Sequence, residues 1–149
     1  MKAERAKLKR LQRLEKLRDV TKQAALGEAA RAESTLAQLT TLAERTRALT
    51  QDYSTRTDMT DGADLSRMVR FVAGLQGIAT TTNADRQRAH ALADKRQAEL
   101  AAAERRRAAV EERANTQARF IAAKAKYTAL SNQTFMPSAA RGKTGTEPA

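Results

Sequence analysis

No proline occurs before residue 137 in this chain of 149 residues, and the two prolines, Pro137 and Pro148, lie near its C-terminus. Proline interrupts helices more strongly than any other residue, and turn-rich β folds need many prolines and glycines. The chain has only six glycines and is rich in Ala, Leu, Glu, Lys and Arg. This composition predicts an all-α fold built from long helices.

The scarcity of other residue types limits the possible chemistry. Three Phe, two Tyr and no Trp are too few for a thick core, because aromatic side chains usually supply much of the buried area. The absence of Cys excludes disulfides and zinc–thiolate sites, and the single histidine, His90, leaves little for acid–base catalysis. No apolar stretch approaches the length that crosses a bilayer. We therefore expect a protein that is not an enzyme and has no catalytic residues, cofactor, metal or small-molecule substrate.

The first predicted helix covers about residues 3–56, where strong helix formers predominate and the only glycine is Gly27. A repeat with steps of three and four residues lies in its second half. Its members are Leu39, Leu42, Thr46, Leu49 and Tyr53. Such steps are typical of a coiled-coil seam.

A turn is predicted at about 57–62, where Thr, Asp and Gly gather, and Asp61 or Asp64 can cap a new helix. The second predicted helix covers about 63–133. One face of its first turns carries Leu65, Met68, Val69, Val72, Leu75 and Ala79. The polar and β-branched run at 80–83 favours a kink or break. The Pro-, Gly- and Ser-containing residues 136–149 predict a disordered tail.

Two long helices joined by one short turn predict an antiparallel two-helix coiled-coil hairpin over residues 1–135, monomeric when alone. The expected facing pairs are Leu49 with Phe71, Leu42 with Ile78, Val20 with Leu100, and Leu11 with Val110. A continuous or oligomeric coiled coil is the alternative. The second helix is longer, so its last turns should project beyond the N-terminus. They carry the apolar stripe Phe120, Ile121, Tyr127 and Leu130. This stripe binds a partner, or the N-terminus covers it, or the terminal turns fray.

Positive charge is concentrated at the two ends of the hairpin sequence. The chain has 28 Lys and Arg against 17 Asp and Glu, a net charge of +11. Residues 1–22 hold nine basic and three acidic residues, and residues 105–135 hold seven basic and two acidic residues. An acidic protein cavity or a nucleic acid would be attracted to such an end, or the charges merely solvate a coiled coil. Neither a base-stacking array nor zinc-finger spacing occurs, so a nucleic acid is the less expected partner.

Three segments together resemble a known family. They are the basic, leucine-spaced opening at 10–18, the segment after the turn at 65–75, and the charged second arm at 98–114. The chain resembles FliJ-type proteins of the bacterial flagellar type III export apparatus over about residues 5–135. The resemblance implies a cytoplasmic antiparallel coiled coil, similar to the stalk of rotary ATPases. It also implies a chaperone-like component required for motility, which reaches the inner face of the membrane only through its partners.

The resemblance further implies two partners, the flagellar export ATPase and an export-gate protein. The expected contacts with the ATPase ring are Arg5, Lys9, Arg10, Arg13, Leu14, Arg119, Phe120, Lys124 and Tyr127. The expected contacts with the export gate are Gln38, Leu42, Leu49, Phe71 and Leu75. Two alternatives stay open from the residues alone: a basic helical protein that binds nucleic acid, and a structural coiled coil that associates with itself.

Overall fold

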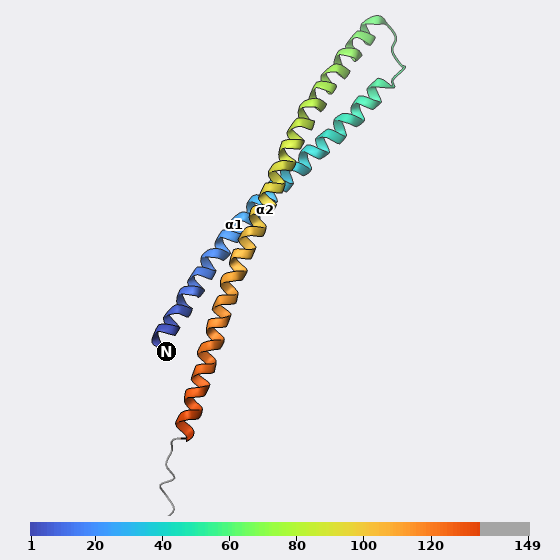
Figure 1. The fold of residues 1–149 in the computed structure, drawn as a ribbon. Helices are drawn as coiled ribbons and strands as arrows, with labels where there is room; N and C mark the ends of the chain where they lie inside the picture. The colour runs from blue at the N-terminus through green and yellow to red at the C-terminus, as the bar shows by residue number, and fades with distance from the viewer. Residues whose placement is uncertain (135–149) are drawn as a thin grey trace, which may run out of the picture. The chain divides into compact units, whose positions relative to one another are not determined.

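The computed structural model describes residues 1–134, and all regular structure in this range is helical. Helix α1 covers Lys2–Ser54 and helix α2 covers Gly62–Thr134 (Figure 1). These bounds lie close to the expected 3–56 and 63–133. The all-α prediction is confirmed for the described residues, and the tail predicted at 136–149 lies outside them.

Helix α2 continues through the threonine-rich segment at 80–83. The hydroxyl of Thr80 donates a hydrogen bond to the carbonyl of Gln76 at 3.0 Å, and that of Thr81 donates to the carbonyl of Gly77 at 3.1 Å. A threonine hydroxyl that bonds to the carbonyl four residues earlier is satisfied without breaking the helix. The kink or break that the sequence favours at 80–83 therefore does not interrupt α2.

The turn between the helices contains seven residues, 55–61, and ends in a helix cap. Oδ1 of Asp61 accepts a hydrogen bond from the backbone N–H of Asp64 at 2.8 Å, which satisfies one of the free N–H groups of the first turn. The Thr60 hydroxyl donates to Oδ2 of Asp64 at 2.9 Å. The expected cap is thus confirmed and assigned to Asp61. Asp64 lies in the first turn of α2, where a negative charge is favoured by the helix dipole.

The described residues form two compact units. The terminal unit contains Met1–Glu15 and residues 109–134, and the turn unit contains Lys16–Ala108. Within the turn unit, Asp19 near one end of the α1 segment lies 3.1 Å from Nε of Arg107, and Tyr53 at the other end contacts Phe71. The two helix segments of this unit are therefore antiparallel. This arrangement confirms the predicted two-helix hairpin.

The turn unit is held together by a seam of small side chains. On α1 the seam contains residues 25, 29, 32, 36, 39, 43, 46, 50 and 53, all buried or half-buried. On α2 it contains residues 68, 72, 75, 79, 82, 86, 89, 93, 96, 100, 103 and 107. The alternating steps of three and four residues are the heptad pattern of a coiled coil. Most of its buried apolar members are alanines, such as Ala29, Ala32, Ala89 and Ala93, so the core is thin.

At two positions the seam of α1 contains the residue that follows the predicted one. Leu42 and Leu49 are each 45% exposed, whereas the next residues, Ala43 and Thr50, are half-buried. The prediction was wrong at these positions because it favoured the larger side chains over the smaller ones beside them. Small seam residues let two helices approach closely, and the leucines then lie at the flank of the seam.

Near the loop at 55–61, the pairing of α1 with α2 is shifted by one helical turn from the expected pairing. Tyr53, four residues beyond Leu49, packs on Phe71 with ring centroids 4.6 Å apart. The other predicted pairs of this unit also fail, because Ile78 and Val20 are exposed outside the seam, although Leu100 is buried within it. On α2, Met68, Val72, Leu75 and Ala79 of the predicted face belong to the seam. Leu65 and Val69 are exposed.

Candidate functional site

The terminal unit joins the first turns of α1 to the last third of α2. Leu8 and Leu11 of α1 are half-buried, and Val110 of α2 is buried in the seam of this unit. Gln117 is also buried, and its Nε2 donates a hydrogen bond to Oε2 of Glu4 at 2.6 Å. This polar pair reduces apolar packing at the end of the seam, and it fixes which residues face one another. Both members of the predicted Leu11–Val110 pair lie in this seam.

Helix α2 continues beyond the N-terminus of α1 within this unit (Figure 1). Residues 122–133 are all exposed, and Ile121 is the last half-buried residue of α2. Phe120, Tyr127 and Leu130 are 50%, 77% and 64% exposed. The predicted apolar stripe on a projecting helix end is therefore confirmed for these three side chains. The alternative, that the N-terminus covers them, is wrong.

The exposed apolar side chains of α2 do not continue the seam that faces α1. Continued past Ile121, that seam would reach the polar residues Lys124, Thr128 and Ser131. A second repeat, with steps of four and three residues, instead follows another face of α2. We call this face the outer stripe; it consists of Thr116, Phe120, Ala123, Tyr127 and Leu130, all exposed. In this unit α2 therefore has two heptad faces, one covered by α1 and one uncovered.

A groove accompanies the outer stripe where α1 and α2 run together. The groove has a volume of about 660 Å³. The lining residues are Lys7, Leu11, Ala109, Glu112, Arg113, Thr116 and Gln117. Leu11 and Gln117 belong to the seam, whereas Thr116 begins the outer stripe. The groove therefore lies beside the seam and on the same side of α2 as the outer stripe.

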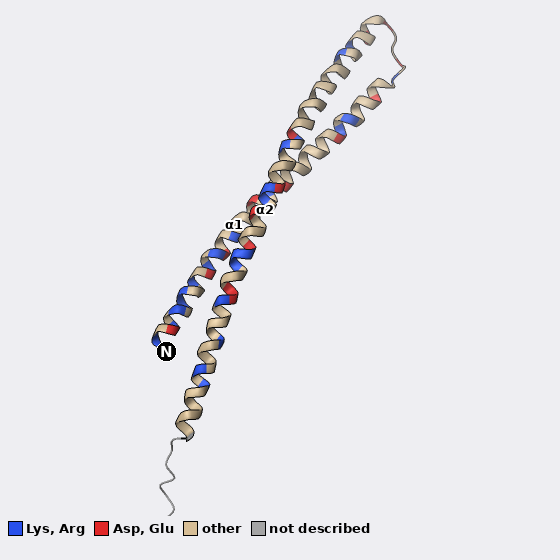
Figure 2. Ribbon diagram, viewed as in Figure 1, with Lys and Arg blue, Asp and Glu red and all other residues tan. Residues whose placement is uncertain are grey.

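Positive charge surrounds the groove and the outer stripe. The described part of the terminal unit has ten Lys and Arg against four Asp and Glu, a net charge of +6 (Figure 2). Nζ of Lys124 lies 5.8 Å from the ring centroid of Phe120, so a cation and an exposed aromatic ring are neighbours here.

The nine predicted contacts with the ATPase ring all lie in the terminal unit, and all are exposed. They are Arg5, Lys9, Arg10, Arg13, Leu14, Arg119, Phe120, Lys124 and Tyr127. On α1 they do not share one face. Leu14 lies two turns after Lys7 and thus on the groove side. Arg5 and Lys9 lie two residues from Lys7, about 200° around the helix, and face away from the groove.

On α2 the predicted contacts are also divided between faces. Phe120 and Tyr127 follow Arg113 at intervals of seven residues, so they lie on the groove side. Lys124 lies on the same side, as its position over the Phe120 ring requires. Arg119 is rotated about 120° away from Arg113. Phe120, Lys124 and Tyr127 therefore lie together on the groove side of α2. Leu14 lies on the groove side of α1 but at the other end of the unit, because Glu4 already pairs with Gln117. Arg5, Lys9 and Arg119 lie on other faces.

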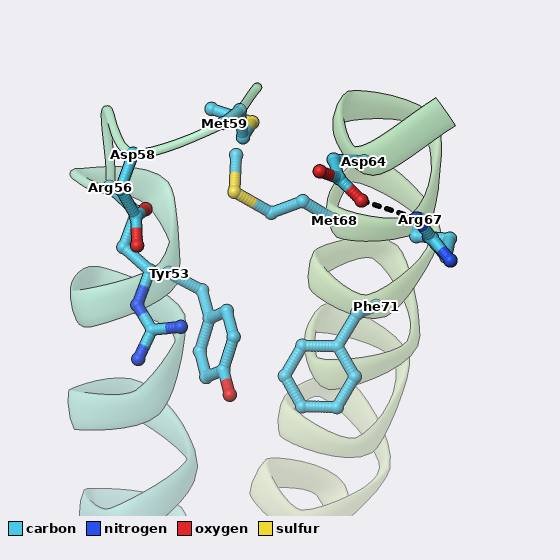
Figure 3. Close-up of a pocket in the computed structure, with 8 residues that line it drawn as sticks. All are labelled: Tyr53, Arg56, Asp58, Met59, Asp64, Arg67, Met68 and Phe71. Carbon is cyan, nitrogen blue, oxygen red and sulfur yellow. Dashed lines mark hydrogen bonds and ion pairs between the residues drawn. The ribbon is translucent and has the colours of Figure 1, made fainter. Parts of the chain in front are cut away.

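A second hollow lies in the turn unit, beside the turn (Figure 3). The rings of Tyr53 and Phe71 project toward each other from the two helices, at an interplanar angle of 58°. The Arg56 guanidinium lies 4.3 Å from the centroid of the Tyr53 ring. The hollow measures about 390 Å³ and is lined by Tyr53, Arg56, Asp58, Met59, Asp64, Arg67, Met68 and Phe71. Asp64 and Arg67 form an ion pair at its edge.

The predicted contacts with the export gate all lie in the turn unit but differ in accessibility. Leu42, Leu49 and Phe71 are each about half exposed, and Gln38 is exposed. Leu75 is only 7% exposed and belongs to the seam. A partner therefore has access to the first four side chains, whereas Leu75 is unavailable while the two helices remain packed.

Residues 1–134 lack the side-chain clusters of a metal site and the long apolar stretch of a membrane span. No group of three or more His, Asp and Glu side chains there could hold a metal ion, and neither helix has a stretch long and apolar enough to span a membrane. His90 lies on an exposed surface with Nδ1 3.1 Å from Oδ2 of Asp94. Arg96 donates a hydrogen bond to Glu99 at 2.9 Å, and this bond raises the pKa of Arg96 above its ordinary value.

Sequence reasoning assigned none of the seven groove-lining residues to a site; those missed include Lys7, Arg113 and Thr116. The signal that could have found two of them is the interval of seven residues, because Lys7 precedes Leu14 and Arg113 precedes Phe120 by that interval. Thr116 is four residues before Phe120, which fits the same repeat. Because the side chains at these positions are small or charged, the large apolar residues alone do not show this heptad repeat.

The comparisons with known proteins add no relative. No family model, curated protein or solved structure matches the chain. Only the chemistry and the arrangement of the residues described above therefore indicate a function.

Proposed function

We propose that this chain is a non-enzymatic component of the bacterial flagellar protein export apparatus. In this proposal it couples the ring of the export ATPase to the export gate, and it has a chaperone-like role toward the exported proteins. It acts in the cytoplasm, and it reaches the inner face of the membrane only through its partners. No cofactor or small-molecule substrate takes part.

The observation that carries the proposal is the composition of the terminal unit. This unit combines a net charge of +6 in its described residues with exposed Phe120, Tyr127 and Leu130 on the projecting end of α2. A helix end that is both basic and apolar suits an acidic protein cavity, which would neutralise the charge and cover the apolar side chains. In this proposal, the pore of the ring-shaped export ATPase is the cavity that receives the terminal unit.

The proposed contact with the export gate involves the turn unit. Leu42, Leu49 and Phe71 expose about half of their surface beside the seam, and Gln38 supplies a polar group on α1. Exposed apolar side chains at the flank of a coiled coil favour contact with another protein. Leu75 is omitted from this proposed surface because it is buried.

A charge-reversal experiment tests the contact with the ATPase ring. Arg10, Arg13, Arg119 and Lys124 are replaced together by Glu. The four side chains are exposed, so the fold should persist, but an acidic cavity would now repel the terminal unit. We expect loss of ATPase binding in a pull-down and loss of motility in cells that carry the variant.

A control with the same number of reversals uses exposed residues of the turn unit. Arg47, Lys95, Arg105 and Arg106 are replaced by Glu, and ATPase binding should persist.

Normal motility of the terminal-unit variant would contradict the proposal. Binding to duplex DNA whose logarithm of affinity falls linearly with the logarithm of salt concentration would favour the nucleic-acid alternative instead. A mass that rises with protein concentration would favour self-association.

A further inference from the structure

The outer stripe of α2 has the geometry of a helix-binding face. Its residues Thr116, Phe120, Ala123, Tyr127 and Leu130 follow steps of four and three residues and are all exposed. This is the same repeat by which α2 packs on α1 along its other face. A heptad face packs side chains between those of a second helix, so its natural complement is an α-helix.

The groove extends this face onto α1. The apolar side chains of Ala109 and Leu11 line it together with the cationic side chains of Lys7 and Arg113. A groove between two antiparallel helices runs along their axes, so a third helix can lie in it and continue over Phe120 and Tyr127. A membrane surface, in contrast, would contact the projecting side chains and leave the floor of the groove empty.

The charges beside the stripe determine the chemistry of the partner helix. Four cationic side chains, Lys7, Arg10, Arg113 and Lys124, lie on or near this side. The acidic side chains there are Glu112, in the lining of the groove, and Glu4, which is bonded to Gln117. A helix with acidic flanks would therefore be attracted, and a basic helix would be repelled. A second copy of the terminal unit would present the same excess of positive charge, which disfavours self-pairing through this face.

The geometry points to one occupant: a single amphipathic α-helix of another protein, with an apolar stripe and acidic flanks, which binds in the groove and along the outer stripe to form a local three-helix bundle. The outer stripe extends over 15 residues from Thr116 to Leu130, so the contact covers about two heptads. This inference concerns the chemistry of a partner and does not depend on the flagellar assignment.

The test uses the full chain and a synthetic helical peptide of about three heptads, with Leu at the seam positions and Glu beside them. The chain has no cysteine, so one introduced thiol can carry a fluorescent dye without background labelling. Thr116→Cys places the dye in the groove. Ala118→Cys, two residues later and exposed, places it about 200° around α2 as the matched control.

We expect the peptide to change the fluorescence of the dye at position 116 and to leave the dye at position 118 nearly unchanged. Replacing Lys7 and Arg113 by Glu should weaken binding by about tenfold or more, because both line the groove. Replacing Lys2 and Lys16 by Glu changes the net charge equally on the far side of α1, and it should change the affinity by less than about threefold.

Three results would overturn the inference. The first is equal binding of a peptide in which Lys replaces Glu, because the charge argument would then fail. The second is an equal response of the two dyes or of the two charge variants, which would indicate general attraction without a groove. The third is a stronger response at position 116 to vesicles rich in phosphatidylserine than to the peptide. The assay contains no ATPase, so its failure would leave the proposed function standing, and loss of the ATPase contact would leave this inference standing.

Discussion

Side-chain size at single seam positions determines how closely the two helices pack in the turn unit. Ala29 is 1% exposed and Ala93 is 2% exposed, although neither has more than a methyl group to bury. Alanine at such positions loses little side-chain entropy and permits close contact between helix backbones. A larger residue there would force the helices apart or adopt a strained rotamer.

Replacing Ala29 by Leu should therefore destabilise the protein by about 1–3 kcal/mol, because the seam has no room for the added methylene groups. Thermal or urea denaturation followed by circular dichroism measures the effect. Ala30→Leu is the matched control, since Ala30 is exposed on the same turn of α1 and its replacement should be nearly neutral. A stabilising effect of Ala29→Leu would contradict the close packing described here.

Asp61 supports the start of α2 through its hydrogen bond to the backbone of Asp64. Asp61→Ala should lower the free energy of unfolding by about 0.5–2 kcal/mol, the usual range for loss of a cap. Asp58→Ala, in the same turn but before the cap, should have a smaller effect. Equal losses in the two variants, measured by urea denaturation, would show that Asp61 has no special role as a cap.

At the scale of elements, α2 contains two glycines in its interior that the described structure does not require. A Cβ added at Gly74 or Gly77 would meet no atom within 4 Å, and no described glycine has a positive φ. Interior glycine lowers helix stability because it loses more backbone entropy than alanine on folding. These residues make the first part of α2 less stable than its length suggests.

Gly74→Ala and Gly77→Ala should each stabilise the protein by about 0.5–1 kcal/mol. Gly62→Ala is the control, because Gly62 lies in the first turn of α2, where helix propensity has less influence. Melting temperatures of the three variants provide the comparison. A lower melting temperature of either interior variant would contradict this expectation and would show that the glycine makes a contact that alanine disrupts.

The helices and the turn were predictable from sequence because proline, glycine and capping residues act locally. The bounds of both helices and the cap at Asp61 follow from such residues. The seam was less predictable, since the choice between Leu42 and Ala43 depends on how closely two helices approach, which is a property of the pair. The outer stripe was only partly predictable. The sequence indicates its large apolar members, Phe120, Tyr127 and Leu130, but the small residues Thr116 and Ala123 complete its repeat.

At the scale of the whole molecule, the two units differ in charge. The described terminal unit has a net charge of +6 from ten basic and four acidic residues, whereas the larger turn unit has a net charge of +4 from 16 basic and 12 acidic residues. Charge per residue is thus greater in the terminal unit. Sequence alone predicts this excess, but the excess does not distinguish an acidic protein from a nucleic acid as a ligand, because both carry the complementary charge.

The most direct test of the proposed function is a pull-down of the tagged full chain from the cells that encode it, treated with nuclease and washed at high salt. We predict recovery of the hexameric export ATPase, and its loss when Arg10, Arg13, Arg119 and Lys124 are replaced by Glu. Apolar contacts through Phe120 and Tyr127 should let the wild-type complex withstand the salt that screens surface charges. Recovery of only nuclease-sensitive material, with no ATPase at any salt concentration, would contradict the proposal.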